Sequence, residues 1–415
     1  MISSEIAPHL EFKNNGSKII LFVIDGVGGL PLPKTGLTEL ETAKIPNLDR
    51  LASKGVTGMI TPIAPGVSPG SGVAHLALLG YDPFTYDVGR GAIAAYGVGL
   101  KMEEDDIAVR VNFAGFNSAG AVVDRRAGRL ATEKNMELCK LLREIKIHDI
   151  EIIIETVMDY RSVVIFRGEG LHPDISDSDP QATGEGVFPE PVVALKPRSR
   201  YAASIARTFI KEANDILQTK EAKAIAELPN GQHLGILTRG YSDRPKLPLM
   251  QHLYGLESLG AIASYPDYRG IARIVGMDVI YDGHELNDEF DKLEEVFHNY
   301  DFIFFHVKEI DSAGEDGNFD KKVSLLEEID KQISRIEDLS PEVLVITGDH
   351  STPAIYKGHS WHPVPFLLVS KWCRPDNVKR FCESECRNGE LGLFHATEVM
   401  LYALGNAGRI DKFRA

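Results

Sequence analysis

Acidic side chains, joined in one case by an imidazole, follow three separate apolar runs of the sequence. Each run is short enough to form a buried strand. The residues that follow these runs are Asp25, Asp311, Asp349 and His350. Because the carboxyl ends of strands in an open α/β sheet are where ligands bind, we expect these side chains to converge. Carboxylate oxygens and imidazole nitrogens suit divalent cations, so the pattern predicts a site for one or two metal ions, with His359 as a further candidate ligand.

Each of these residues also has an ordinary structural interpretation. Asp25 followed by Gly26 is by itself compatible with a simple turn after a strand, since both residue types favour turns. A lone histidine close to a proline, as at His362-Pro363, is often structural. Acidic residues follow three separate strands, and one of them is next to a histidine, in Asp349-His350. Turns alone do not explain this combination, which therefore favours a metal site.

A serine at the boundary between a loop and a helix is the candidate nucleophile. Pro and Gly punctuate the stretch from residue 65 to Gly70, and a helical pattern begins near Ser71. The N-terminus of a helix offers unpaired N–H groups and a positive dipole end, which stabilise an alkoxide and an incoming phosphate. The alternative is that Ser71 is only the N-cap of the helix, a position that serine favours.

The segment that begins near Tyr81 is rich in glycine and, for an acidic chain, rich in arginine. Guanidinium groups bind carboxylates and phosphates through two parallel hydrogen bonds, so a cluster of them suits an anionic substrate. Any single arginine is equally compatible with a solvated surface charge. The candidate substrate-binding residues of this segment are Arg125, Arg126, Arg129, Arg161, Arg167 and Arg239.

The elements that must position these residues follow from the apolar patterns. Strands are predicted at 18–24, 56–61, 107–112, 120–124, 150–157, 162–167, 261–264, 301–311, 343–346 and 366–370. Helices are predicted at 38–54, 199–220, 249–259, 268–275, 285–298, 323–336 and 396–404. The resulting plan is an α/β domain from residues 1–80 and 244–415, with a smaller α+β domain from residues 81–243 inserted into it.

Composition limits the classes of function. At 415 residues, 43% of them hydrophobic, the chain is long enough for two domains with sizeable cores. Its net charge of −15 argues against non-specific binding to nucleic acid. The four cysteines have no paired CxxC spacing, no apolar run approaches the ~20 residues of a membrane span, and the N-terminus lacks a signal-peptide core. We therefore expect a cytoplasmic protein with no membrane partner, whose oligomeric state stays open.

Seven motifs, in this order, resemble the archaeal-type cofactor-independent phosphoglycerate mutases of the alkaline phosphatase superfamily. The resemblance runs from about Lys18 to Leu404. Its motifs are Val23–Gly26, Pro69–Ser71 with Ala74–Leu76, Asp124–Arg129, Arg167–Gly170, Ser176–Pro180, Leu237–Gly240 and Thr347–Pro353. The resemblance implies an alkaline-phosphatase-like three-layer core with a mixed, mostly parallel sheet, plus the inserted domain.

The resemblance also implies a reaction and its residues. Two divalent ions are expected, Mn²⁺ first and Mg²⁺, Co²⁺ or Zn²⁺ as other possibilities. Ser71 is expected to accept the phosphoryl group of 3-phosphoglycerate, a small phosphorylated substrate, and to return it to the 2-hydroxyl without 2,3-bisphosphoglycerate. The implied ligands of one ion are Asp25, Ser71, Asp349 and His350, and those of the other are Asp311, Glu315 and His359. Arg269 stands where this family tends to carry lysine, and is expected to contact the phosphate.

The sequence departs from the family pattern at a few positions. Glu315 stands where the family has histidine in Asp-x-x-Gly-His, and it is either a carboxylate ligand or a solvated acid beside Asp316. Gly72 and the Trp361-His362 pair also differ from the usual residues. Three functions therefore remain open: a phosphoglycerate mutase, a related enzyme that transfers phosphate to another acceptor such as homoserine or to water, and a metal-binding relative without activity.

Overall fold

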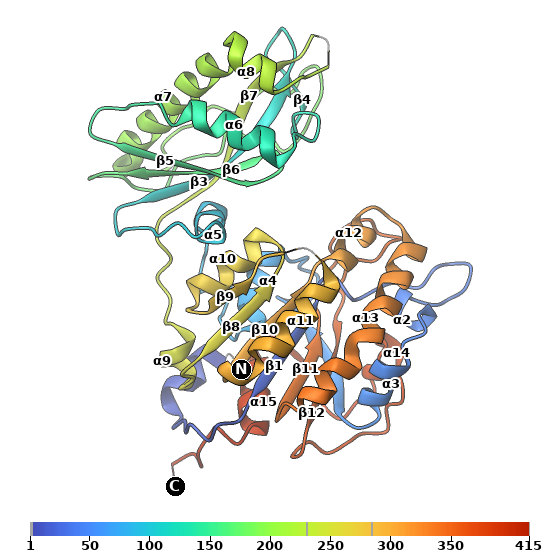
Figure 1. Ribbon diagram of the computed structural model, residues 1–415. Coiled ribbons are helices and arrows are strands. Elements are labelled where there is room, and N and C mark those ends of the chain that lie inside the picture. The colour runs from blue at the N-terminus through green and yellow to red at the C-terminus, as the bar shows by residue number, and fades with distance from the viewer. Residues whose placement is uncertain (1–2, 230, 284, 415) are drawn as a thin grey trace. The chain divides into compact units, whose positions relative to one another are not determined.

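A computed structural model describes residues 3–229, 231–283 and 285–414 of the chain (Figure 1). Its contacts divide the polypeptide into two units. The first unit combines both ends of the chain, Met1–Asp87 and Leu247–Ala415, and the second unit is the segment Val88–Lys246 between them. The domain boundaries expected from the sequence, after residues 80 and 243, lie a few residues before these two divisions.

The first unit is built on a mixed, mostly parallel sheet, as the resemblance implied. Its strand order is β13-β2-β12-β11-β1-β10-β8-β9, and only β12 runs antiparallel to its neighbours. The strands are β1 (Ile19–Ile24), β2 (Val56–Thr61), β8 (Leu259–Ala263), β9 (Asp278–Tyr281), β10 (Phe302–Val307), β11 (Val343–Thr347), β12 (Val364–Ser370) and β13 (Gly392–His395).

Helices complete the three-layer core of the first unit. Every residue of β1, β10 and β11 is buried, which is the pattern of parallel strands covered on both faces. One group of helices packs around α13, which lies with α11 in front of the sheet in Figure 1, and a second group includes α4 and α10, which pack on each other. The larger helices are α3 (Pro46–Ala52), α4 (Ser71–Leu78), α10 (Pro266–Ile274), α11 (Leu286–Val296), α12 (Glu309–Glu315), α13 (Phe319–Leu339) and α15 (Val399–Asn406).

The second unit is a smaller α+β structure with an antiparallel sheet. Its central strand, β3 (Ile107–Phe116), pairs with β4 (Val122–Asp124), β6 (Arg161–Arg167) and β7 (His233–Ser242), and β5 (Glu151–Met158) pairs with β6. Apolar side chains of the sheet, such as Val111 and Phe166, are buried against helices that include α6 and α7. The helices are α5 (Arg90–Gly97), α6 (Thr132–Leu142), α7 (Arg200–Leu217) and α8 (Lys220–Ile225).

Several predicted elements are wrong in extent. The helix expected at 38–54 is two helices, α2 (Glu39–Thr42) and α3, because Pro46 excludes a helical conformation from the residue before it and Ile45 is not helical. The helix expected at 249–259 ends at Tyr254, since Gly255 adopts a left-handed conformation. The prediction also missed β7, β9, β13, α5, α6 and α12.

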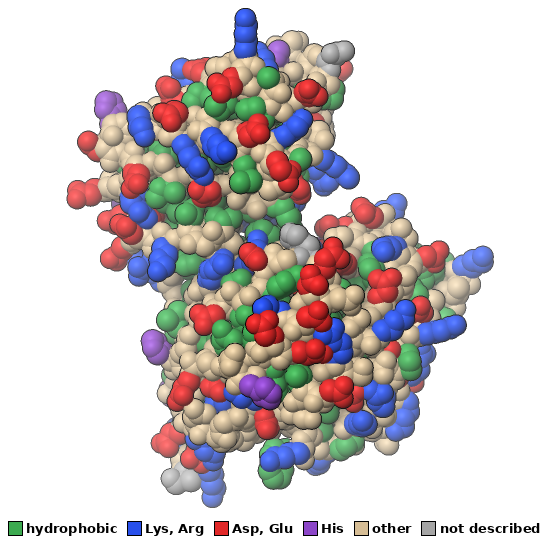
Figure 2. All heavy atoms as spheres, in the orientation of Figure 1, with side chains coloured by type: hydrophobic (Ala, Val, Ile, Leu, Met, Phe, Trp, Pro, Cys, Tyr) green, Lys and Arg blue, Asp and Glu red, His purple; other side chains and the backbone are tan. Residues whose placement is uncertain are grey.

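Side chains of both charges lie on the visible surface. Acidic and basic side chains are interspersed on the face shown in Figure 2, so neither sign dominates there. Within the described ranges, no helix combines the length and the apolar character needed to span a bilayer.

Candidate functional site

Three neighbouring parallel strands bring the predicted metal ligands to one edge of the sheet. Strand β1 lies between β10 and β11 and is parallel to both. The loops after β1 and β11 carry Asp25, Asp349 and His350, and α12, which follows β10, carries Asp311 in its first turn. Helix α4 brings Ser71 to the same place, with its Oγ atom 3.4 Å from Nε2 of His350.

The first ligand group consists of Asp25, Asp349 and His350, all fully buried. Nε2 of His350 lies 3.4 Å from Oδ1 of Asp25 and 3.1 Å from Oδ2 of Asp349. Neither of these carboxylate oxygens accepts a hydrogen bond from any group that the structure describes. Buried carboxyl oxygens without hydrogen-bond partners are costly, and here both of them face the same imidazole nitrogen. This donor set therefore fits a divalent cation.

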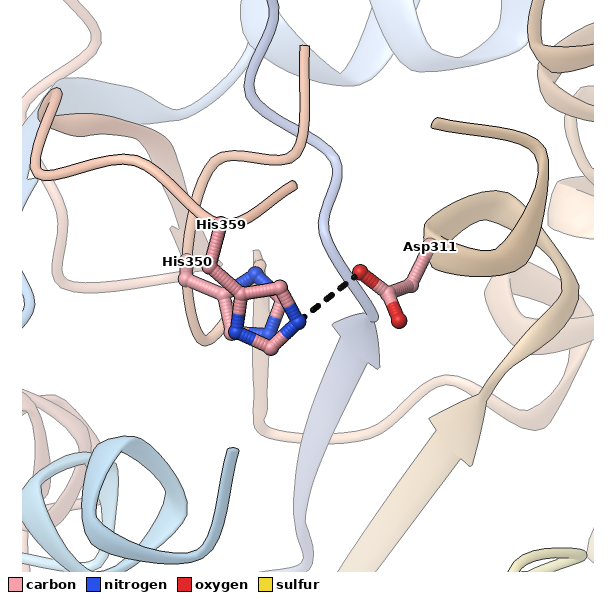
Figure 3. Close-up of side chains that lie close together, drawn as sticks. All are labelled: Asp311, His350 and His359. Carbon is pink, nitrogen blue, oxygen red and sulfur yellow. Dashed lines mark ion pairs between the residues drawn. The ribbon is translucent and has the colours of Figure 1, made fainter. Parts of the chain in front are cut away.

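The second ligand group consists of Asp311, His350 and His359 (Figure 3). Nε2 of His359 lies 3.4 Å from Oδ1 of Asp311, and the rings of His350 and His359 stack with centroids 3.7 Å apart. Oε1 of Glu315 is 3.6 Å from the same Nε2 atom, on a side chain that is 55% exposed. The predicted ligand Glu315 thus lies at the rim of this group, next to His359.

Hydrogen bonds at Nδ1 of His350 and His359 orient both rings so that their Nε2 atoms point toward the ligand groups. Nδ1 of His359 lies 3.0 Å from the carbonyl oxygen of Pro69, so it carries the proton and donates it. Nδ1 of His350 lies 2.9 Å from Oγ1 of Thr352, whose hydroxyl donates to Oδ1 of Asp311 at 2.6 Å. Because this hydroxyl donates its hydrogen atom to Asp311, its oxygen accepts the hydrogen bond from Nδ1–H of His350. Both Nε2 lone pairs are then available to a metal ion.

Burial and neighbouring charges set the protonation states of the first ligand group. Burial opposes ionisation of Asp25, but the charges of Lys308 and His306 outweigh it and hold the Asp25 pKa well below its ordinary value. Burial, together with the charges of Asp25 and Asp311, raises the pKa of Asp349 well above its ordinary value. Burial lowers the pKa of His350 to about 3, which keeps the imidazole neutral. A cation in the group would supply the positive charge that lets Asp349 ionise.

Ser71 is not the N-cap of its helix, so that interpretation of the residue is wrong. Gly70 occupies the N-cap position, Ser71 is the first residue of α4, and no side chain caps this terminus. The serine hydroxyl faces His350 instead. Nδ1 of His75, one helical turn later, lies 2.7 Å from the Ser71 carbonyl oxygen. The hydroxyl is therefore placed at the helix N-terminus beside the first ligand group.

A buried lysine ties together the loops that carry the ligands. Nζ of Lys322, on α13, donates to the carbonyl oxygens of Gly26, Gly28 and Thr352 at 2.9, 3.0 and 2.8 Å. Gly26 has φ of +64°, and a Cβ atom there would lie 2.6 Å from Oγ1 of Thr352. Only glycine therefore fits where the chain turns beneath Asp25.

Sequence reasoning missed the side chains that surround Asp25. The Tyr268 hydroxyl donates to Oδ2 of Asp25 at 2.6 Å, and Nε2 of His306 lies 3.3 Å from the same atom. Nζ of Lys308 lies 3.1 Å from it and also contacts Asp311. Lys308 is three residues before Asp311 in the sequence, so its proximity to the predicted ligands could have been noticed. Tyr268 arrives from a distant helix, α10, for which no local signal exists.

Arginines of the second unit line a separate cavity of about 180 Å³. Its walls include three of the predicted residues, Arg125, Arg126 and Arg239. Arg125 is held by a bidentate pair with the buried carboxylate of Asp179, with Nε at 2.8 Å from one oxygen and Nη2 at 2.5 Å from the other. The complete lining is Arg90, Arg110, Asn112, Arg125, Arg126, Tyr160 and Arg239.

Arg90 and Arg110 were not predicted, although the register places Arg110 on β3 directly opposite Arg239 on β7. That register is a long-range pairing, which no local pattern reveals. The buried Oδ1 atom of Asn112 has no hydrogen-bond partner among the described groups. The cavity thus combines several guanidinium groups with an uncompensated polar atom, which suits a small anion that also carries hydroxyl donors.

The other predicted arginines lie elsewhere in the structure. Arg167 pairs with Asp106, with Nη2 at 2.7 Å from Oδ2, and Arg269 pairs with Asp282 at 3.3 Å in the first unit. Arg161 lies over the ring of Tyr160, with 4.7 Å between its Cζ atom and the ring centroid. Together with Arg129, these residues are not among those that line the cavity described above.

Comparisons with known proteins agree with this geometry. The model of the family described as 2,3-bisphosphoglycerate-independent phosphoglycerate mutase matches residues 52–223. A curated relative from Thermus thermophilus, named "Probable 2,3-bisphosphoglycerate-independent phosphoglycerate mutase", is 46% identical over 96% of this chain and 96% of its own length. A relative of the same name from Aquifex aeolicus is 44% identical over 97% of this chain and 98% of its own.

Solved structures share the fold of this chain. A protein from Pyrococcus horikoshii superposes with a TM-score of 0.80 at 31% identity, covering 96% of this chain and 99% of its own. The cofactor-independent phosphoglycerate mutase from Thermoplasma acidophilum superposes with a TM-score of 0.67 at 27% identity, covering 94% of this chain and 100% of its own. Since the similarity to named relatives extends over nearly the full length of both chains, this chain belongs to the family of 2,3-bisphosphoglycerate-independent phosphoglycerate mutases.

Proposed function

We propose that this protein interconverts 3-phosphoglycerate and 2-phosphoglycerate, with divalent cations and without 2,3-bisphosphoglycerate. Membership of the family supports the reaction. The observation that carries the proposal is the position of Ser71, whose hydroxyl lies at a helix N-terminus and 3.4 Å from the imidazole of the first ligand group. A hydroxyl so placed is suited to become a nucleophile toward a phosphoryl group.

The residues of the first unit divide the chemistry between them. Asp25, Ser71, Asp349 and His350 would hold one ion, and Asp311, Glu315 and His359 the other. When bound, such ions lower the pKa of a coordinated hydroxyl and offset the charge of the phosphoryl group. Oγ of Ser71 loses its proton and forms a bond to phosphorus while the bond from phosphorus to the 3-oxygen of glycerate breaks, and the 3-oxygen takes up a proton, which leaves phosphoserine and a free 3-hydroxyl. The 2-hydroxyl then loses its proton and bonds to phosphorus while the bond from phosphorus to Oγ of Ser71 breaks, and Oγ takes up a proton again.

The second unit would bind the glycerate. Arg125, Arg126 and Arg239 line a cavity whose volume of about 180 Å³ suits a three-carbon acid. Bidentate guanidinium contacts would hold the carboxylate while the phosphoryl group is on Ser71, and would keep water from taking its place. The proposal therefore assigns chemistry to the first unit and retention of the acceptor to the second.

The predicted ligands suggest which metal ion the sites would hold. The two sites would contain the carboxylates of Asp25, Asp311, Glu315 and Asp349, and oxygen-rich sites favour Mn²⁺ or Mg²⁺ over Zn²⁺. We propose Mn²⁺ as the working ion, with Mg²⁺, Co²⁺ and Zn²⁺ as the others to test.

All four cysteines are unpaired, which supports a reducing, cytoplasmic setting.

A coupled assay tests the proposal against its alternatives. The purified protein is mixed with 3-phosphoglycerate, Mn²⁺ and enolase, without bisphosphoglycerate, and phosphoenolpyruvate is followed by absorbance. We expect steady turnover that a chelator abolishes and Mn²⁺ restores. Release of inorganic phosphate alone would indicate a phosphomonoesterase, and transfer to added homoserine would indicate another phosphotransferase. Absence of turnover with each of the four metals would indicate a relative without activity.

A further inference from the structure

The ammonium group of Lys308 lies between the carboxylates of the two ligand groups. Its Nζ atom is 3.1 Å from Oδ2 of Asp25, which belongs to the first group, and 2.5 Å from Oδ2 of Asp311, which belongs to the second. The side chain is only 19% exposed, and Nζ also lies 5.6 Å from the ring centroids of Tyr265 and Tyr268. One charge is therefore shared between two sites that would each take a cation.

The two oxygens of each carboxylate are divided between Lys308 and the histidines. Lys308 contacts both Oδ2 atoms, whereas Oδ1 of Asp25 faces His350 at 3.4 Å and Oδ1 of Asp311 faces His359 at 3.4 Å. The ammonium thus does not contact the oxygens that face the imidazoles, of which Oδ1 of Asp311 also accepts a hydrogen bond from Thr352. It also remains beside both sites as a positive charge when such ions bind.

We propose that Lys308 is a resident third cation of this centre, which stabilises the metal-free carboxylates and weakens the binding of divalent ions to them. This inference rests on the proposed function only in that the ligand groups bind metal. The Nζ atom lies within 3.1 Å of one carboxylate oxygen and 2.5 Å of a second, and both of these neighbours favour the charged ammonium.

Removing this charge has two opposite effects on metal affinity. The ammonium repels an incoming divalent ion, so its loss strengthens binding. It also fixes the orientation of both carboxylates, so its loss weakens binding. A unit charge within a few ångströms of a divalent ion in a buried site has the larger effect, because Coulomb energies there exceed the cost of ordering a short side chain. We therefore expect net tightening, by about tenfold or more in Kd.

The test compares Lys308→Met, which keeps an unbranched side chain of similar length and removes its charge, with the wild-type full-length protein. Melting temperature in chelator reports the metal-free state, and titration calorimetry with Mn²⁺ reports affinity. We expect Lys308→Met to melt at a lower temperature without metal and to bind Mn²⁺ about tenfold more tightly. Lys308→Arg, which keeps the charge, should restore both values toward wild type. Lys211→Met removes an exposed lysine from the second unit and should change neither.

Clear results would overturn the inference. If Lys308→Met binds Mn²⁺ less tightly or equally, and melts without metal at the wild-type temperature, Lys308 is not a resident cation of the centre. If that variant does not fold, Lys308→Gln, which retains a hydrogen-bond donor without charge, is measured in its place and is held to the same criteria. Failure of the wild type to bind any divalent ion would contradict the proposed function instead, and the comparison of metal-free melting temperatures would then decide the role of Lys308.

Discussion

Individual side chains of the metal centre occupy charge states that they would not adopt in water. His350 is held neutral by burial, and Asp349 resists ionisation because burial and two other carboxylates oppose it. Asp25 is the anion of the group, stabilised by Lys308 and by the Tyr268 hydroxyl. Such opposed shifts between neighbouring groups are typical of functional sites. They also show that a single added cation would change several protonation states at once.

Ser71 is the residue whose removal should separate chemistry from folding. We expect Ser71→Ala to abolish mutase turnover while changing the unfolding free energy by less than about 1 kcal/mol, because the serine makes no capping bond. The coupled assay and chemical denaturation measure the two effects. Ser53→Ala, in the turn that follows α3, serves as the control and should retain activity. An alanine variant at 71 that keeps more than trace activity would remove Ser71 from the proposed mechanism.

Glu315 is the predicted ligand that tests how many ions the proposed centre holds. If its carboxylate joins Asp311 and His359 around one ion, Glu315→Ala should retain one Mn²⁺ per chain where the wild type retains two. Glu315→His should shift the preferred ion away from Mn²⁺, because an imidazole replaces a hard oxygen ligand. Elemental analysis after dialysis gives the metal content, with the neighbouring Asp316→Asn as control. Two ions per chain and unchanged activity in the alanine variant would make Glu315 a bystander.

The candidate site residues could be predicted where the neighbouring sequence shows the end of a buried strand. Asp25, Asp349 and His350 follow apolar runs that end in Gly or a turn, so both their type and their place at a strand end could be read directly. Tyr268 lies in an ordinary context and acts only through a contact made across the fold, whereas Thr352 lies within the Thr347–Pro353 motif but its contact with Asp311 could not be read from it. Long-range register explains why Arg110 was missed while Arg239, in the Leu237–Gly240 motif, was found.

At the scale of elements, the site depends on loops being held to one helix. Lys322 is fully buried and uses all three of its N–H donors on carbonyl oxygens of the loops after β1 and β11. These loops carry Asp25 and His350. Helix α13 therefore holds both ligand-bearing loops through Lys322, although none of the predicted ligands lies on this helix.

Lys322→Met should loosen both loops and weaken the binding of Mn²⁺. Each buried carbonyl left without a donor costs about 1–3 kcal/mol, so the unfolding free energy should fall as well. Turnover should recover in part at saturating Mn²⁺, because the ligands themselves are intact. Lys321→Met, the exposed neighbour on the same helix, is the matched control. If stability falls while Mn²⁺ affinity stays at the wild-type value, Lys322 supports the fold without positioning the ligands.

Predictable elements were those with strong and uninterrupted patterns. The buried strands β1, β10 and β11 and the long amphipathic helices α7 and α13 were found, because their burial is continuous or follows a helical period. Short edge strands such as β9 and β13 were missed, since four residues carry too little periodicity. The helix expected across Pro46 failed because apolar spacing was given more weight than the proline.

At the scale of the whole molecule, the two units supply different chemistry. The first unit holds acidic and imidazole ligands, and the second holds a cavity lined by five arginines. This division matches a reaction in which a phosphoryl group is retained by one part of the chain and an anionic acceptor by another. The net charge of −15 therefore conceals a local basic site, which composition alone does not show.

Loss of acceptor binding should expose the phosphoryl group to water. We expect Arg239→Lys to lower mutase turnover and to raise the ratio of phosphate release to isomerisation, because lysine keeps the charge but loses the bidentate contact. Arg198→Lys changes an exposed arginine of the same unit and should match the wild type in both measures. Phosphate is measured with a colorimetric assay beside the enolase-coupled rate. Equal ratios in all three proteins would show that the arginine cavity does not hold the acceptor.

In the proposed mechanism, the phosphoryl group leaves a glycerate and returns to the same molecule. A mixture of unlabelled 3-phosphoglycerate and substrate that carries ¹³C in the glycerate and ¹⁸O in the phosphate tests this directly by mass spectrometry of the 2-phosphoglycerate formed. Without bisphosphoglycerate and with Mn²⁺, we predict product that is either unlabelled or labelled in both parts. Product labelled in only one part would show that glycerate or phosphate exchanges between molecules, and would contradict the account.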